Sequence, residues 1–202
     1  MTKPPAVILA GGKATRMGGG DKGLRTIGGK PLLDYVLDRM RPQSGPIVLN
    51  ANGDAARFAD YGLPVLPDTL PDHPGPLAGV LAGLDWAAAQ GNDAIVTAAA
   101  DTPFFPADLV DRLQQAAGPS GLALAATREG DKIWRQPTFG LWPVALRDDL
   151  RDALQNGLRK IVMWTDQHDA GLAIFDTDPV DPFFNVNTPD DITEAERLLE
   201  AL

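Results

Sequence analysis

The amino-acid sequence predicts an α/β fold, in which a mostly parallel central sheet lies between helices on both faces. Two observations predict this fold class. Short apolar runs without alternating polar residues recur along the first half of the chain, and such runs are typical of strands buried on both faces. Helical patterns separate the runs, and this alternation of strands and helices is typical of parallel sheets.

The first expected strand covers residues 6–10 (AVILA), and Gly11 and Gly12 follow it at once. Because glycine has no Cβ, this pair lets the backbone turn sharply and lets its N–H groups approach a ligand closely. A basic loop comes next, in which Asp21 is the single anion and the cations are Lys13, Arg16, Lys22, Arg25 and Lys30. A buried strand, a glycine turn and a basic loop together predict a phosphate-binding site.

Two familiar phosphate-binding patterns do not account for this loop. Gly18, Gly20 and Gly23 match the dinucleotide-binding spacing, but they lie well past the expected strand rather than in a strand-to-helix turn. Gly29-Lys30 is followed by proline rather than by serine or threonine, so the hydroxyl group of a P-loop is absent. The loop therefore predicts phosphate binding of another kind.

The rest of the first half continues the strand–helix alternation. A proline can begin a helix, and the apolar residues after Pro31 fall on one helical face. The expected elements are a helix over 31–40, a strand over 46–50, a short helix over 54–60, a strand over 63–67, a helix containing 77–84 after the proline-rich loop 71–76, and a strand over 94–100. These three strands end at Asn50, Asp68 and Asp101, and ligands bind beyond the carboxyl ends of such strands.

The second half is less regular. The expected elements are a helix over 106–117, strands over 121–127 and 138–142, helices over 144–155 and 160–167, and a strand over 170–175. Near the end, Thr188 is a suitable N-cap, Pro189 suits the first helical position, and the aspartates after it suit the positive end of a helix. No repeat, low-complexity tract or linker interrupts the chain, so residues 1–202 are expected to form a single domain.

Composition excludes several classes of protein. The formal net charge is −9, whereas the segment 9–30 carries +4, so the chain offers a local anion site rather than the extended basic face of a nucleic-acid-binding protein. No cysteine is present, and His73 and His168 are too few for a histidine-based metal cluster. Neither Ser44 nor Ser120 lies in a nucleophile elbow, which excludes a typical serine hydrolase.

The first apolar run is too short for the core of a signal peptide or for a membrane span. We therefore expect a soluble, cytoplasmic protein.

The three polar strand ends and the basic loop suggest separate roles for their residues. Asp101 at its strand end could hold Mg²⁺, which takes one or two protein carboxylates and completes its shell with water and phosphate oxygens. Arg16 and Lys22 could stabilise the negative charge that develops when a phosphoryl group is attacked. Asp68, with Asn50, could accept hydrogen bonds from the N1–H and 2-amino groups of guanine. Polar residues also end strands for purely structural reasons, and for Asn50 alone this alternative stays open.

The string Leu9-Ala10-Gly11-Gly12-x-x-x-Arg16-Met17-Gly18-x-x-Asp21-Lys22 resembles the signature loop of nucleotidyltransferases, and its Ala-Gly-Gly form resembles that of the molybdenum cofactor guanylyltransferase family. The segment 75–79 (GPLAG), an Asp-x-Pro at Asp101 and the segment 185–189 (NVNTP) are similar to further motifs of that family, in the same order. The family often has Cys-Asp where this chain has Ala100-Asp101, a difference that keeps the carboxylate.

This resemblance implies a three-layer Rossmann-like nucleotidyltransferase fold with a mostly parallel central sheet. It implies that the N-terminal half binds GTP, through the residues Leu9, Ala10, Gly11, Lys22, Asn50, Asp68 and Asp101, with Gly12 also holding the triphosphate. The C-terminal half would bind molybdopterin. The amides of Asn185 and Asn187 would meet the pterin, and its phosphate would contact Arg159, Lys160 and the segment 135–138. A helix-capping role explains the asparagine-rich turn nearly as well.

The expected reaction is transfer of GMP from GTP to molybdenum-molybdopterin, with Mg²⁺ as cofactor and pyrophosphate as the leaving group. Arg16, Lys22 and Asp101 are the expected catalytic residues. We expect a monomer that contacts molybdoenzymes or cofactor chaperones transiently and binds neither nucleic acid nor membrane. The alternatives are a molybdopterin cytidylyltransferase, a sugar-phosphate nucleotidyltransferase, or a non-catalytic carrier of the pterin cofactor.

Overall fold

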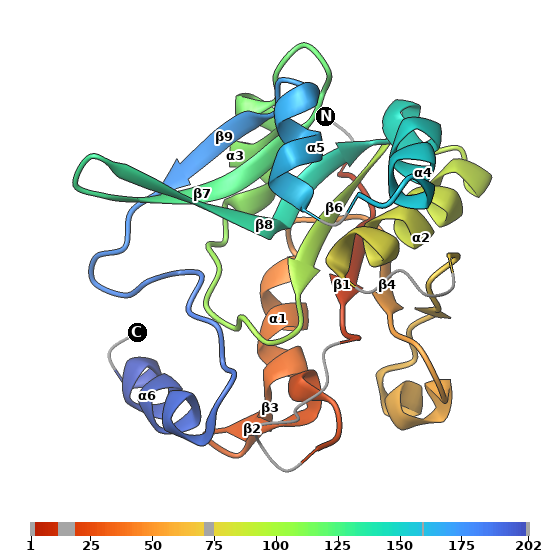
Figure 1. Cartoon of the computed structure of the whole chain (residues 1–202). Coiled ribbons are helices and arrows are strands. Elements are labelled where there is room, and N and C mark those ends of the chain that lie inside the picture. The colour runs from red at the N-terminus through yellow and green to blue at the C-terminus, as the bar shows by residue number, and fades with distance from the viewer. Residues whose placement is uncertain (1–2, 12–18, 71–74, 159, 201–202) are drawn as a thin grey trace.

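The computed structural model describes residues 3–11, 19–70, 75–158 and 160–200 of the chain. In this part of the chain the centre is a seven-stranded sheet with the order β5-β4-β1-β6-β8-β7-β9 (Figure 1). Its strands are β1 (Ala6–Leu9), β4 (Ile47–Asn50), β5 (Val65–Leu66), β6 (Ala94–Ala99), β7 (Ala123–Glu129), β8 (Lys132–Pro143) and β9 (Gly171–Phe175). Strand β8 runs against both of its neighbours, and the other pairings are parallel. The prediction of a mostly parallel central sheet is confirmed.

The four strands of the N-terminal half end at the same edge of the sheet. Leu9 at the end of β1 lies beside Asn50 on one side and Ala99 on the other, and Asn50 lies beside Leu66 of β5. Because these strands are parallel and in this register, the residues that follow them leave the sheet side by side. This alignment brings distant polar residues of the sequence to one edge.

Helices cover both faces of the sheet (Figure 1). Their bounds are α1 (Leu32–Met40) and α3 (Leu109–Ala116) on one face, and α2 (Pro76–Ala89), α4 (Arg147–Gln155) and α5 (Ile161–Gln167) on the other. Strand β1 is buried on both sides, because Ile8 belongs to the apolar cluster of α1 and Val7 to the cluster of α2. This double burial explains why the run 6–10 contains no alternating polar residue.

A smaller layer forms below the sheet edge, where the last helix, α6 (Pro189–Leu199), packs on the hairpin of β2 (Thr26–Ile27) and β3 (Lys30–Pro31). Ile27, Leu32 and Ala195 are fully buried in this contact. The predicted N-cap of α6 is confirmed, because the Thr188 side chain accepts a hydrogen bond from the backbone N–H of Asp191 in a capping box.

Several boundaries differ from the expectation. Pro31 is the last residue of β3 and precedes α1 rather than starting it, because the backbone around it is paired with Thr26. The segment expected as a short helix over 54–60 is a 3-10 helix, η3 (Ala55–Tyr61). Helix α3 begins at Leu109 rather than at 106.

The largest difference concerns β8, which begins at Lys132 and not at 138. Its first residues pair with the end of β7 in a hairpin, and Gly130 turns the chain with a φ of +58°. The sequence carries the signal for this turn in Gly130-Asp131, a pair that favours tight turns between strands. The hairpin extends the sheet well beyond the predicted strand and projects from the left of the molecule in Figure 1.

None of the helices among the described residues is long and apolar enough to span a membrane.

Candidate active site

A cavity of about 440 Å³ lies at the carboxyl ends of the parallel strands. The strand ends contribute its walls, and the beginning of α2, the middle of β8 and the segment after β9 close it. Its lining residues are Leu9, Gly11, Asn50, Asn52, Asp68, Gly75, Pro76, Ala99, Asp101, Thr138 and Asn185. The structure thus brings together Gly11, Asn50, Asp68 and Asp101, which the sequence places at the ends of four separate strands.

One end of the cavity is a network of amides around the carboxylate of Asp68. The amide nitrogen Nδ2 of Asn50 donates to Asp68 Oδ1 at 2.9 Å and to the carbonyl of Leu66 at 3.1 Å. Asn52 Nδ2 donates to Asp68 Oδ2 at 2.7 Å, and the backbone N–H of Asp68 donates to Asn52 Oδ1 at 2.9 Å. The carboxylate is therefore held in one orientation at the end of β5, with free lone pairs for a further donor.

Helix α2 approaches this network closely because position 79 is a glycine. A Cβ at Gly79 would lie 2.8 Å from Asn50 Cγ and 2.9 Å from Leu9 Cδ2, shorter than ordinary contacts between carbon atoms. The glycine therefore leaves the space that the Asn50 amide occupies. This contact gives a physical reason for the glycine of the GPLAG segment.

Beside the cavity, three distant parts of the chain meet around Lys22, which pairs with the lining residue Asp101. Its ammonium group lies 3.3 Å from Asp101 Oδ2 and also donates a hydrogen bond to Asn187 Oδ1. The backbone N–H of Val186 donates to the carbonyl of Asp101 at 2.9 Å, which ties the C-terminal segment to the end of β6. Lys22 and Asp101 are mostly buried, with 22% and 14% of their side chains exposed.

The pKa of Asp101 is raised above its usual range, because burial disfavours the carboxylate and the charge and hydrogen bond of Lys22 only partly offset this. Any additional cation close to this carboxylate would stabilise its charged form. Burial together with one cationic neighbour gives Asp101 the environment of a functional carboxylate rather than of a solvated surface group.

The donor set around Asp101 also fits Mg²⁺. Among the described residues no group of three or more metal-ligating side chains occurs, so a fully protein-coordinated ion is not built into this part of the chain. Magnesium uses one or two carboxylates and takes its remaining ligands from water and phosphate oxygens. Asp101 supplies one such carboxylate at the cavity.

A second ion pair anchors the part of the basic loop that precedes Lys22. Arg57 Nε of η3 lies 2.7 Å from Asp21 Oδ2, and Arg25 donates to the carbonyl of Gly19. Two residues were not predicted from the sequence: Asn52, which lines the cavity, and Arg57, which pairs with Asp21 of the basic loop. Asn52 follows a strand end by two residues and could have been found by the rule for strand ends, whereas nothing in the local sequence marks Arg57.

Other predicted residues are placed differently or lie outside the described residues. Ala10 is buried at the strand end without lining the cavity, and Lys160 is exposed before α5, away from the lining residues. Gly12, Arg16 and Arg159 fall outside the described residues, as does Lys13. Their roles stay predictions. From the candidate segment 135–138, Thr138 lines the cavity, whereas Arg135 pairs with Asp166 of α5 at 2.5 Å.

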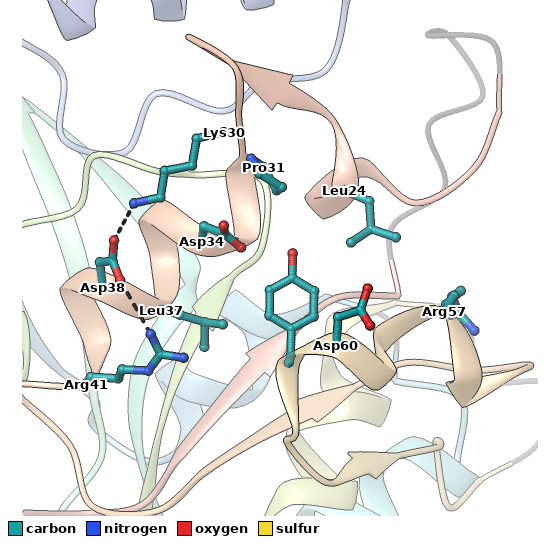
Figure 2. A pocket seen from close by; sticks show the side chains of 10 residues that line it. Leu24, Lys30, Pro31, Asp34, Leu37, Asp38, Arg41, Arg57 and Asp60 are labelled. Atoms are coloured by element: carbon teal, nitrogen blue, oxygen red, sulfur yellow. Dashed lines mark hydrogen bonds and ion pairs between the residues drawn. The ribbon is translucent and has the colours of Figure 1, made fainter.

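A larger hollow of about 730 Å³ lies between α1 and η3 (Figure 2). Carboxylates of Asp34, Asp38 and Asp60 face it, and Asp38 pairs with both Lys30 and Arg41 (Figure 2). Lys30, one of the five cations of the basic loop, is thereby directed away from the strand ends. Lys30, Arg41 and Arg57 also line this hollow, but each is already paired with an aspartate, so the hollow offers a triphosphate no free cation among these three.

Comparison with known proteins agrees with this geometry. Residues 6–170 match the family model described as the MobA-like NTP transferase domain. A molybdenum cofactor guanylyltransferase from Nitrobacter hamburgensis is 51% identical over 200 residues, covering 96% of this chain and 95% of the relative. A protein of the same name from a Bradyrhizobium species is 50% identical, with 98% and 93% covered.

Solved structures share the fold at lower identity. Molybdopterin-guanine dinucleotide biosynthesis protein A from Archaeoglobus fulgidus superposes with a TM-score of 0.74 at 23% identity, covering 98% of this chain and all of that one. The 2-C-methyl-D-erythritol 4-phosphate cytidylyltransferase from Thermus thermophilus gives 0.70 at 19% identity, with 99% and 100% covered. By the extent of its similarity to the first two relatives, the chain belongs to the molybdenum cofactor guanylyltransferase family.

Proposed function

We propose that this protein transfers GMP from GTP to molybdenum-molybdopterin and releases pyrophosphate. A terminal phosphate oxygen of the pterin substrate attacks the α-phosphorus of GTP, the bond from this phosphorus to the bridging oxygen breaks, and pyrophosphate carries the electron pair away. The observation that carries the proposal is that Asp68 and Asp101 line one cavity and that Lys22 pairs with Asp101 at 3.3 Å.

The cavity provides different chemistry at its two ends. At the Asp68 end, a fixed carboxylate suits the N1–H and 2-amino donors of guanine, an edge that cytosine lacks. At the other end, Lys22 supplies a positive charge that favours phosphate oxygens and the pyrophosphate leaving group. The nucleotide would therefore lie with its base near β5 and its phosphates near the turn after β1.

Asp101 is the residue that would hold Mg²⁺ in this proposal, supported by its burial, its raised pKa and its place beside Lys22. When bound, the ion would neutralise phosphate oxygens and stabilise the charge that develops on them. The contact of Lys22 with Asn187 would keep the lysine extended toward the same place, so that its charge needs little reorganisation during the reaction.

The test is an assay of pyrophosphate release with purified protein, Mg²⁺ and molybdenum-molybdopterin, in which GTP, CTP and UTP are compared. We expect release with GTP and much less with the other two nucleotides. Preference for CTP would show a cytidylyltransferase instead, and binding of the pterin without pyrophosphate release would show a carrier.

Two lysine variants form a matched pair for the same assay. Lys22→Gln removes the charge at the cavity and should lower kcat by about tenfold or more, as for loss of one electrostatic contact in the transition state. Lys30→Gln removes a loop charge that pairs with Asp38 in the other hollow, and should leave kcat near the wild-type value. Equal effects of the two substitutions would contradict the assignment of Lys22.

A further inference from the structure

A second cavity of about 500 Å³ lies between the hairpin of β7 and β8 and the segment that follows β9. Its lining residues are Thr127, Glu129, Trp134, Gln136, Thr177 and Asp181. We call it the Trp134 cavity. None of these residues lines the nucleotide cavity, and only Gln136, within the segment 135–138, was a candidate from the sequence.

Trp134 is an unusual residue for a surface position. Its side chain is 53% exposed, whereas Trp142 and Trp164 are buried at 0% and 1%. It lies on β8 opposite Thr127 of β7, and the cavity beside it also contains the carboxylates of Glu129 and Asp181. An aromatic face with hydrogen-bond acceptors around it suits a flat heteroaromatic ring that carries N–H donors.

The Trp134 cavity is a neighbour of the nucleotide cavity along two stretches of chain. On β8, Trp134 and Gln136 line the former and Thr138 the latter. After β9, Asp181 lines the former and Asn185 the latter. Four residues span at most about 14 Å even when fully extended, so the two cavities lie within reach of one elongated molecule.

The segment between the cavities is held in place by Phe183. This side chain is buried and packs against Phe139 of β8 and Phe175 of β9, with ring centroids 4.9 and 5.5 Å apart. The spacing between the cavities is therefore fixed by the core and does not depend on a free loop.

The charges in the two cavities favour one orientation of a ligand that spans both. The carboxylates of Glu129 and Asp181 would repel a phosphate from the Trp134 cavity, whereas Lys22 would attract it to the nucleotide cavity. A ligand that spans both would place its anionic end near Lys22 and its flat, N–H-rich end beside Trp134.

We propose that the Trp134 cavity binds the pterin ring system of the acceptor substrate, with Trp134 stacked on the ring and the carboxylates accepting from its amino and ring N–H groups. This inference rests on the proposed function, because it names the place of the second substrate in the same reaction. The phosphate of that substrate then points toward the Lys22–Asp101 pair, where the α-phosphorus of GTP is attacked.

The test compares Trp134→Ala with Trp134→Phe and with Ile133→Ala, a neighbouring side chain that is 44% exposed and does not line the cavity. Two readouts are used: the KM for molybdenum-molybdopterin with saturating GTP, and the dissociation constant of neopterin, a stable pterin, measured by its fluorescence. Loss of the stacking face should raise both values about tenfold in the alanine variant and little in the other two. The KM for GTP should not change in any of them.

The outcomes separate this inference from the proposed function. If Trp134→Ala keeps wild-type affinity for neopterin and the acceptor while the protein still makes the guanine dinucleotide, the inference is wrong and the function stands. If the wild-type protein releases no pyrophosphate, the proposed function is wrong. Binding of neopterin alone then tests whether the Trp134 cavity takes a pterin. If the alanine variant loses only its affinity for an acceptor protein, Trp134 belongs to a docking surface and the inference is also overturned.

Discussion

The substitution Gly79→Ala tests whether the close approach of α2 holds the nucleotide end of the site. The new methyl group would lie 2.8 Å from Asn50 Cγ and 2.9 Å from Leu9 Cδ2, about 0.6 Å or more inside an ordinary carbon contact. Overpacking of this kind costs about 1–3 kcal/mol, and loss of the two Asn50 hydrogen bonds adds about 1 kcal/mol each. The better helix propensity of alanine returns about 1 kcal/mol. We expect a net loss of about 2–4 kcal/mol in the free energy of unfolding.

The decisive readout is GTP affinity, because a displaced Asn50 no longer orients Asp68. Loss of one hydrogen bond to a charged group should raise the dissociation constant of GTP about 10- to 100-fold. Gly83→Ala is the matched control: its Cβ would lie 2.5 Å from Val7 Cγ2 and 2.9 Å from Ile95 Cδ1 in the core, one turn further along α2. Both variants should unfold at lower urea concentration, but only Gly79→Ala should weaken GTP binding in calorimetry. Unchanged GTP affinity in Gly79→Ala would refute the reasoning.

Two further variants address the other end of the site and the last helix. Asp101→Asn should lower kcat by about 10²- to 10³-fold, because it removes the carboxylate that would hold Mg²⁺ beside the phosphates. It should not lower the melting temperature, because it also removes a buried carboxylate whose charge is costly. Near-normal turnover at saturating Mg²⁺ would exclude Asp101 from the mechanism. Asp191→Asn should cost about 1 kcal/mol in urea unfolding at pH 7, because its carboxylate accepts backbone hydrogen bonds from Asn187 and Thr188 at 2.8 Å. Burial alone would raise the pKa of Asp191, but these hydrogen bonds lower it overall, so its contribution is present above its unfolded pKa and is lost as pH falls through the folded value. Wild type and variant should therefore differ in unfolding free energy at pH 6 and converge toward pH 2, and a difference that does not depend on pH would contradict the role of the charge.

Local sequence patterns predict the parts of the site that secondary structure alone creates. Asn50, Asp68 and Asp101 could be placed together because each follows an apolar run, and parallel strands end at one edge. The N-cap at Thr188 was likewise visible, since capping depends on residues three positions apart.

Contacts between distant segments could not be predicted in this way. Lys22 meets Asn187 across 165 residues, and Arg57 meets Asp21 from a 3-10 helix whose sequence carries no sign of it. Such pairs depend on how the layers pack, which periodicity does not encode. The hairpin that carries Trp134 was missed for a simpler reason: its polar residues mask the strand pattern on either side of Gly130.

The bond from Val186 to the carbonyl of Asp101, together with the contact between Asn187 and Lys22, has a consequence for biosynthesis of the protein. A nascent chain that has left the ribosome only as far as α5 already contains every strand end of the nucleotide cavity, yet its lysine lacks one of its two partners. Full assembly of the phosphate end therefore waits for the final residues to emerge, so an incompletely made chain would be a poor enzyme even if its sheet had formed.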